Sequence, residues 1–251
     1  MTCTIQLLEK PTLNDPILIE GLPGIGFVAN IATLHLINEL KTPQFAEIHS
    51  SSFQDLAVTA ENGKPRFPTN ELYYHKATNP EERDLIILYG NTQALTTTGQ
   101  YELCSKILNI AQDLGCRYAI TLGGLRRNGK ITESPKLYCA ASDPETLKHA
   151  QNLGAEAIEG QIYGIAGLLT GLSKLWNTHS FCLLAETPGT YPDTKAAREV
   201  LTAISKILHT QANMTQLDRA TETTQQILKS FGLTSQSPEE KRKEEPYGWR
   251  I

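Results

Sequence analysis

Short apolar runs alternate with longer amphipathic segments through most of this chain. The runs read as buried β-strands and lie at residues 16–20, 45–49, 83–89, 117–122, 135–140 and 181–185. The segments between them carry apolar residues at helical spacing and lie at 26–40, 99–114, after the Asp143-Pro144 cap, at 164–175 and after Asp193. Because alternating strands and helices build sheets covered on both faces, the sequence predicts a three-layer α/β domain with a mostly parallel sheet.

Two further features complete the predicted organisation. Residues 56–60 and 71–76 flank the turn-rich Asn62-Gly63-Lys64-Pro65 and are expected to form a β-hairpin with an enlarged loop. The composition changes near residue 212, so we expect an α/β domain over 1–212 and a helical extension with a charged tail over 213–251. The extension contains an expected helix at 215–231 with one narrow apolar face.

Charge and cysteine usage exclude several classes of protein. The formal net charge of the 251 residues is -4, and no basic stripe suggests nucleic-acid binding. The five cysteines form no C-x-x-C pair, which is typical of a reducing compartment. Without a signal-peptide pattern or an apolar run of the ~20 residues that a membrane helix needs, we expect a cytoplasmic protein with no membrane partner.

The glycine-rich turn at residues 21–29 permits two interpretations. Gly24, Gly26 and Ala29 fit the G-x-G-x-x-G/A pattern of a dinucleotide-binding turn, and Glu47 follows at the distance of an acidic ribose partner. The other interpretation is a tight strand-to-helix turn that packs closely. We favour the tight turn, because Leu22-Pro23 inserts a rigid step and Pro23 lacks an amide donor.

A second glycine pattern has the spacing of a phosphate-binding loop but lacks its chemistry. Gly124, Gly129 and Lys130 match G-x-x-x-x-G-K, whereas Ile131 stands where a hydroxyl is required. A β-turn at Asn128-Gly129 is the favoured interpretation.

A third pattern consists of glycines at intervals of four, three and four residues, namely Gly160, Gly164, Gly167 and Gly171. On a helix they would share one face. Such a stripe suits close packing against the sheet or against another subunit, and suits a ligand site less well.

Recognisable catalytic motifs are missing from the sequence. It contains neither H-E-x-x-H nor G-x-S-x-G, and its six histidines are scattered without metal-ligand spacing. Glu186 and Thr187 end a strand near Asp193 and could line a crevice, but a single acid there is more often an N-cap or a loop anchor. We therefore expect a protein that is not an enzyme and that needs no cofactor and no metal.

The C-terminus combines a charged stretch with terminal aromatic residues. Tyr247, Trp249, Arg250 and Ile251 follow the charged residues 239–245. Because Trp, Tyr and Arg dominate interface hot spots, this tail is a candidate docking peptide for a partner. Folding back onto its own domain remains the alternative.

Five segments together carry a family resemblance. They are IEGLPGIGFVANIATLHLI (19–37), ITLGG (120–124), YCAASD (138–143), GQIYGIAGLLTGL (160–172), and LLAET with PDTKAAREVL (183–187 and 192–201). In order and spacing they resemble the proteasome assembly chaperone family, in its archaeal branch.

The resemblance implies both a fold and a role. The fold would be of the nucleoside phosphorylase and hydrolase type. The role would be non-catalytic, with homo-oligomers holding proteasome subunits or related multi-subunit assemblies during ring formation. Some family members end in hydrophobic-Tyr-X, whereas Arg250 is penultimate here. The alternative is a nucleotide- or nucleoside-handling enzyme that uses the turn at 21–29 and the crevice at Glu186.

Overall fold

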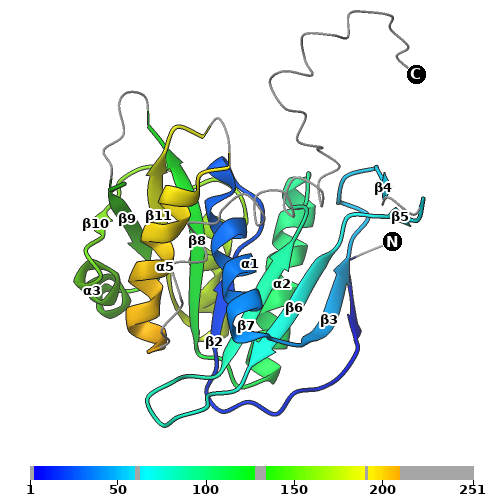
Figure 1. Ribbon diagram of the computed structural model, residues 1–251, viewed down its shortest axis with the longest axis horizontal. Coiled ribbons are helices and arrows are strands. Elements are labelled where there is room, and N and C mark those ends of the chain that lie inside the picture. The colour runs from blue at the N-terminus through cyan, green and yellow to red at the C-terminus, as the bar shows by residue number, and fades with distance from the viewer. Residues whose placement is uncertain (1–2, 60–62, 128–133, 190–191, 210–251) are drawn as a thin grey trace, which may run out of the picture.

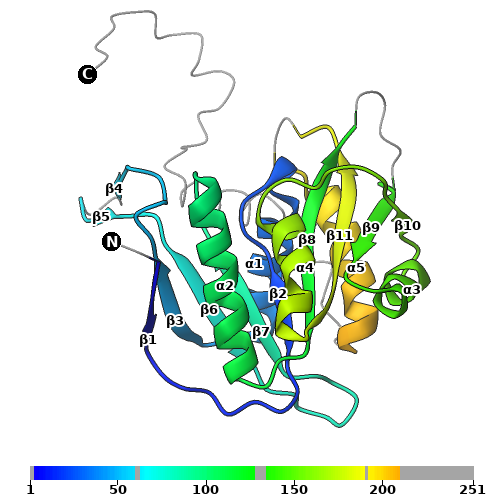
Figure 2. The same ribbon diagram turned by 180° about the vertical axis from the view of Figure 1, so that it is seen from behind.

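The computed structural model describes residues 3–59, 63–127, 134–189 and 192–209. In these residues one mixed sheet lies between two helical layers (Figures 1 and 2). Helices α1 (Val28–Leu40), α3 (Pro144–Asn152) and α5 (Thr194–Leu208) lie on one face, and α2 (Thr97–Asp113) and α4 (Ile165–Leu172) lie on the other. The α/β class expected from the sequence is thus confirmed.

Nine described strands form the sheet in the order β1-β3-β6-β7-β2-β8-β11-β9-β10. In chain order these strands are Thr4–Leu7 (β1), Ile17–Glu20 (β2), Gln44–His49 (β3), Asn70–His75 (β6), Leu85–Gly90 (β7), Tyr118–Arg126 (β8), Leu137–Ala141 (β9), Glu156–Ala157 (β10) and His179–Thr187 (β11). Two short 3-10 helices, Ile25–Phe27 (η1) and Ser173–Trp176 (η2), precede α1 and follow α4.

The prediction of a mostly parallel sheet holds only for the centre. Strands β7, β2, β8 and β11 run parallel to one another. On one flank β1, β3 and β6 pair antiparallel, β6 is antiparallel to β7, and on the other flank β9 is antiparallel to β11. Neighbouring antiparallel strands need no crossover helix, and the segment between β6 and β7 contains none.

The predicted hairpin is also corrected. Val58–Thr59 (β4) pairs with Pro65–Arg66 (β5) in a separate two-stranded sheet. The segment expected to pair with 56–60 is instead β6, which lies between β3 and β7 in the main sheet. Leu72 on β6 is fully buried there, so burial in the core decides the pairing rather than the nearby turn.

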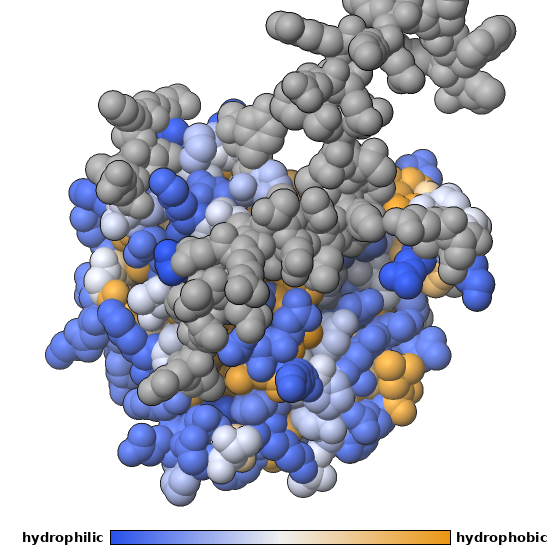
Figure 3. Space-filling model, in the orientation of Figure 1, coloured by the Kyte–Doolittle hydropathy of each residue, from blue (hydrophilic) through white to orange (hydrophobic). Residues whose placement is uncertain are grey.

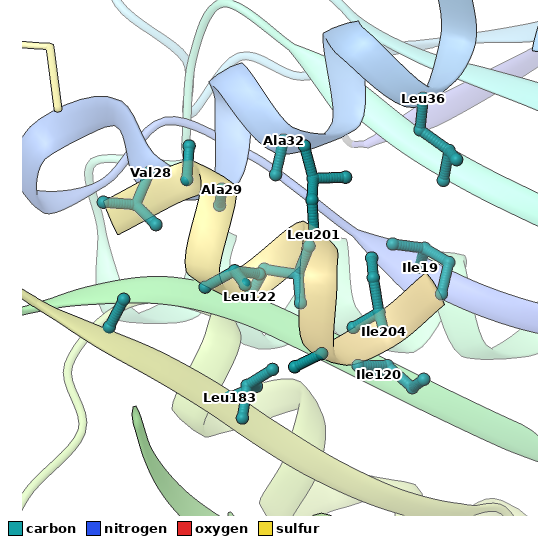
Figure 4. Close-up of a cluster of buried hydrophobic side chains, with 14 of the residues drawn as sticks. Ile19, Val28, Ala29, Ala32, Leu36, Ile120, Leu122, Leu183, Leu201 and Ile204 are labelled. Carbon is teal, nitrogen blue, oxygen red and sulfur yellow. The ribbon is translucent and has the colours of Figure 1, made fainter. Parts of the chain in front are cut away.

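Two apolar cores lie on either side of the sheet. Figure 4 shows the first, in which Leu201 and Ile204 of α5 pack beside α1 and over the central strands. The second fills the space between the sheet and the helices α2 and α4. Ile86 and Ile87 are consecutive on β7 and both are fully buried, as in a strand covered on both faces.

Helices α3 and α5 begin directly after the N-cap residues that the sequence predicts. The carboxylates of Asp143 and Asp193 accept hydrogen bonds from the amides of Thr146 and Ala196 at the starts of α3 and α5. The expected helix at 215–231 and the charged tail lie outside the described residues. The domain boundary at residue 212 therefore stays a prediction.

Candidate functional site

The turn at residues 21–29 joins β2 to α1 and packs tightly against neighbouring strand ends. A Cβ on Gly26 would lie 2.7 Å from Thr187 Oγ1, and a Cβ on Gly124 would lie 2.3 Å from the Ile25 carbonyl oxygen. The Asp193 amide donates to the Gly26 carbonyl at 2.8 Å. Gly26 also has a φ of 66°, which favours glycine. Close packing against β8 and β11 therefore accounts for Gly26 and Gly124.

The structure does not bring Glu47 to this turn. Glu47 lies on β3, and both β6 and β7 separate that strand from β2. Gly24 and Ala29 remain at the turn, but the acidic partner of a dinucleotide fold would have to come from a strand close to the turn. The arrangement required for ribose binding is absent from the described residues.

Gly124 also lies in an unexpected place for a phosphate-binding loop. It is part of β8, which continues to Arg126, whereas such a loop follows the strand. Residues 129–131 lie outside the described residues.

Gln93 ties together the loops at the carboxyl end of the central strands. Its Nε2 donates to the Pro23 carbonyl at 2.5 Å, and its Oε1 accepts from the Ile165 amide at 3.1 Å and from Gln100 Nε2 at 3.2 Å. One side chain therefore connects the turn after β2, the loop after β7, and the beginnings of α2 and α4. This edge of the sheet is held as one surface.

Large apolar side chains are exposed on the segments that Gln93 connects. They are Ile25, Leu95, Tyr101 and Tyr163, and we call this set the edge surface. Leu95 is 65% exposed and Tyr163 is 83% exposed. Leu56 and Phe67 are also exposed beside β4 and β5, where Figure 3 shows an apolar patch at the upper right. Contiguous exposed apolar groups mark protein interaction sites, so this edge of the sheet is a candidate for one. Sequence analysis overlooked the edge surface, and the available signal was that Ile25 and Leu95 follow the apolar strands β2 and β7.

Glu20 is a buried acid that sequence analysis also overlooked. It ends β2 and is 1% exposed, and its Oε1 accepts from the Leu22 amide at 2.8 Å. Its Oε2 has no hydrogen-bond partner among the described residues. Burial raises the pKa of this carboxyl group to about 8. The available signal was an acid that directly ends an apolar strand.

The acids around the predicted crevice are occupied by structural contacts. Glu186 accepts from Tyr138 Oη at 3.0 Å and lies 3.6 Å from Arg127 Nε. Asp193 accepts from Thr187 Oγ1 at 2.8 Å while it caps α5. The three predicted residues Glu186, Thr187 and Asp193 thus lie close together as anchors of strand and helix ends.

The four predicted glycines do not share a helix face. Gly160 and Gly164 precede α4 with φ values of 128° and 80°, which a helix does not allow. Gly167 and Gly171 lie within α4, and a Cβ on Gly167 would lie 2.3 Å from the Ile162 carbonyl oxygen. Nothing lies within 4 Å of the corresponding position on Gly171. Gly167 therefore packs against its own chain.

No group of three or more His, Cys, Asp or Glu side chains among the described residues could hold a metal ion. No described helix has the length and apolar character needed to cross a bilayer. The five cysteines are buried free thiols. Residues 247–251 lie outside the described part of the chain.

A model of the PAC2 family matches residues 18–231. The chain belongs to the PAC2 family. The resemblance to proteasome assembly chaperones is thereby confirmed, and solved PAC2 relatives share the fold. A crystal structure of Pyrococcus furiosus PbaB, an archaeal proteasome activator, is 38% identical, covers 90% of this chain and 97% of its own, and has a TM-score of 0.82.

Two other relatives extend the comparison. Pyrococcus furiosus PbaA, an archaeal homologue of proteasome-assembly chaperone, is 25% identical, covers 96% of this chain and 100% of its own, and has a TM-score of 0.73. An uncharacterised protein of Methanocaldococcus jannaschii is 33% identical over 91% of this chain and 87% of its own. Each of these three relatives aligns with at least 90% of this chain.

Proposed function

We propose that this PAC2 protein is a non-catalytic chaperone or scaffold that binds proteasome subunits and assists proteasome assembly. It would act in the cytoplasm as a homo-oligomer. The observation that carries the proposal is the similarity to PbaB and PbaA over nearly the whole chain. PbaB is described as an archaeal proteasome activator, and PbaA is described as an archaeal homologue of proteasome-assembly chaperone.

The partner-binding residues are proposed at two places. The edge surface offers exposed apolar side chains held in place by Gln93. The terminal residues Tyr247, Trp249, Arg250 and Ile251 supply the residue types that anchor protein interfaces. Binding through both would use a fixed surface and a terminal peptide of the same chain.

A second candidate is activation of the assembled proteasome, and the higher identity to PbaB favours it. An assembly chaperone binds free α-type subunits, whereas an activator binds the finished particle and increases peptide hydrolysis. Incubation with purified proteasomes and a fluorogenic peptide separates the two. Faster hydrolysis would assign activation, and unchanged hydrolysis with retained subunit binding would assign assembly.

The alternative of a nucleotide- or nucleoside-handling enzyme has little support in the geometry. Glu186 and Asp193 are hydrogen-bonded within the structure, and Glu47 is remote from the turn at 21–29. A thermal-shift panel of NAD, ATP and nucleosides tests this alternative. A ligand at 100 times its dissociation constant would stabilise the fold by about 2.7 kcal/mol, so a clear shift would favour the enzyme.

Pull-down of proteasome α-type subunits by the full-length chain tests the proposed function. We expect Leu95→Asp and Trp249→Ala each to weaken capture. Leu175→Asp is the matched control, because Leu175 is 75% exposed on η2 at the other end of α4. Equal capture by all variants would contradict the proposed binding surfaces. No capture by the parent chain would contradict the proposed function.

A further inference from the structure

Strand β1 forms one edge of the nine-stranded sheet and pairs only with β3 among the described strands. Figure 2 shows it as the outermost strand, with no described element along its outer side. Proteins usually protect such an edge from further pairing with a charged side chain, a proline or a β-bulge. Residues 4–8 contain neither a charge nor a proline, and the pairing of β1 with β3 is regular. This edge is therefore open to pairing with a further strand.

The hydrogen-bond pattern of β1 determines which of its main-chain groups face outward. The Leu8 amide donates to the Phe45 carbonyl oxygen at 2.8 Å, so Leu8 belongs to a hydrogen-bonded pair with β3. Hydrogen-bonded and non-hydrogen-bonded residues alternate along antiparallel strands. The N–H and C=O groups of Ile5 and Leu7 therefore point away from β3, toward the unpaired edge of the described sheet.

The side chains of the same two residues are apolar. Ile5 packs partly against the second core, beneath α2. Leu7 projects from the same face of the strand and is 55% exposed. A second β1 strand laid antiparallel beside the first would place Ile5 opposite Leu7 and Leu7 opposite Ile5. Because apolar cross-strand pairs stabilise a sheet, the strand is complementary to a copy of itself.

The contacts at both ends of β1 select one register for such a pair. Two identical strands that pair antiparallel are related by a two-fold axis. An axis beside Ile5 would pair Leu7 with Cys3, whose amide already donates to a carboxylate of α2. An axis beside Leu7 would pair Ile5 with Glu9, whose amide already donates to a carbonyl of β3. An axis beside Gln6 pairs Ile5 with Leu7, and the N–H groups of both point outward.

We propose that β1 pairs antiparallel with β1 of a second copy about a two-fold axis beside Gln6, which joins the two sheets into one. Ile5 and Leu7 of each copy exchange main-chain hydrogen bonds with Leu7 and Ile5 of the other, and such bonds supply the affinity in strand addition. The pairing covers Leu7. It also places Leu8, which is 53% exposed, opposite Thr4 of the second copy.

This pairing fixes how the two partner surfaces are presented. The two-fold axis runs through the sheet, so the second copy is rotated by half a turn in the plane of the sheet. The two edge surfaces then lie at opposite ends of the dimer. The inference specifies the homo-oligomer that the proposed function includes, and it does not depend on the identity of the bound partner.

Disulfide cross-linking in the full-length chain tests the register. The five native cysteines are buried, so a new thiol on β1 reports its own neighbours. At the axis the two Gln6 side chains form a non-hydrogen-bonded pair with Cβ atoms about 4.5 Å apart, which a disulfide can bridge. We expect Gln6→Cys to give a disulfide-linked dimer under mild oxidation.

Thr4→Cys is the matched control on the same face of the strand. The two Thr4 residues would lie about 14 Å apart, because Thr4 opposes residue 8 of the second copy, and no disulfide spans that distance. Thr4→Cys should therefore stay unlinked, and adding Leu8→Cys to it should restore the cross-link. Equal cross-linking of Gln6→Cys and Thr4→Cys would overturn the proposal.

Light scattering of the full-length chain measures the pairing without a cysteine. Leu7→Lys places a charge on the edge and should halve the particle mass, while the exposed site should leave the melting temperature of the domain unchanged. Leu175→Lys, on the 75% exposed leucine of η2, is the control and should keep the parent mass.

Two results of the mass measurement would overturn the proposal. One is a parent mass that Leu7→Lys leaves unchanged. The other is a monomeric parent, which would mean that β1 stays unpaired or is covered by a segment of its own chain. If Leu7→Lys unfolds the domain, the cross-linking of Gln6→Cys decides alone. None of these measurements involves a proteasome subunit, so this pairing and the proposed function can fail separately.

Discussion

The centre of the sheet and its β1–β3–β6 flank are built in different ways. Strands β7, β2, β8 and β11 run parallel, and helices cover both of their faces. Strands β6, β3 and β1 pair antiparallel, and described helices cover only one of their faces. The centre thus sets the positions of the loops at its carboxyl edge, whereas the flank is held mainly by pairing between neighbouring strands.

The same contrast is visible in the carboxylates of the two regions. Glu20 in the centre is buried, and its Oε2 has no partner among the described residues. Glu71 on the flank is partly buried and accepts from Tyr73 Oη at 2.6 Å, and burial raises its pKa. Desolvation therefore acts in both places, but more strongly in the centre.

The largest expected effect concerns the pH dependence that Glu20 contributes. Its pKa is raised from 4.5 to about 8, so the folded state holds a proton that the unfolded chain releases. The stabilising contribution is complete below pH 4.5 and declines as the pH rises through 8. At about 1.4 kcal/mol per pH unit, the loss between pH 4.5 and pH 8 is on the order of 5 kcal/mol.

Urea denaturation of the parent chain and of Glu20→Gln between pH 5 and pH 9 measures this decline. We expect the variant to show a flatter profile. Parallel profiles for the parent and Glu20→Gln would mean that Glu20 is ionised in the folded protein.

The second expected effect separates packing in the centre from packing on the flank. Ile19 is fully buried in the first core, so Ile19→Ala should cost about 2–5 kcal/mol of unfolding free energy. Glu47→Ala on the partly exposed face of β3 should stay within about 0.5 kcal/mol. Chemical denaturation measures the unfolding free energy of both variants. Similar losses in the two would contradict the distinction between the two regions.

The third expected effect tests the helix that covers the back of the centre. Gly167→Leu should cost about 1–3 kcal/mol by overpacking, because the new Cβ would lie 2.3 Å from the Ile162 carbonyl oxygen. Gly171→Leu on the same helix meets nothing within 4 Å and is the control. Thermal denaturation and the oligomer mass should both be measured. An unchanged melting temperature for Gly167→Leu would contradict close packing at this position.

The smallest expected effect concerns the acidic pair on the flank. Glu47 and Glu71 oppose each other across two strands, and like charges in that arrangement destabilise a sheet. Glu71→Gln should therefore stabilise the fold by less than about 1 kcal/mol at pH 8. The gain should shrink as the pH falls, because burial raises the pKa of Glu71 and its protonation removes the repulsion. A loss of stability at pH 8 would indicate that the Tyr73 hydrogen bond outweighs the repulsion.

The sequence predicts the centre well because its signals are local. Residues 17–19 and 85–88 are apolar throughout, as is typical of strands covered on both faces. Asp143 and Asp193 are N-cap residues, and each predicts the start of the helix that it caps. Each of these predictions needs only the residues nearby.

The flank and the candidate site depend on contacts between distant residues. β1 was not predicted, since three of its four residues are exposed and lack alternation. Gln93 connects the loops through hydrogen bonds with Pro23 and Ile165, which lie 70 and 72 residues away in the sequence. The burial of Glu20 follows from its neighbours β7 and β8 rather than from its own segment. No local pattern contains this information.

Native mass spectrometry of the full-length chain mixed with purified proteasome α-type subunits tests the central claim most directly. We expect complexes of defined stoichiometry that Trp249→Ala and Leu95→Asp weaken and that Leu175→Asp leaves intact. Spectra that contain only the separate components, at concentrations where the chain remains folded, would contradict the proposed role in proteasome assembly.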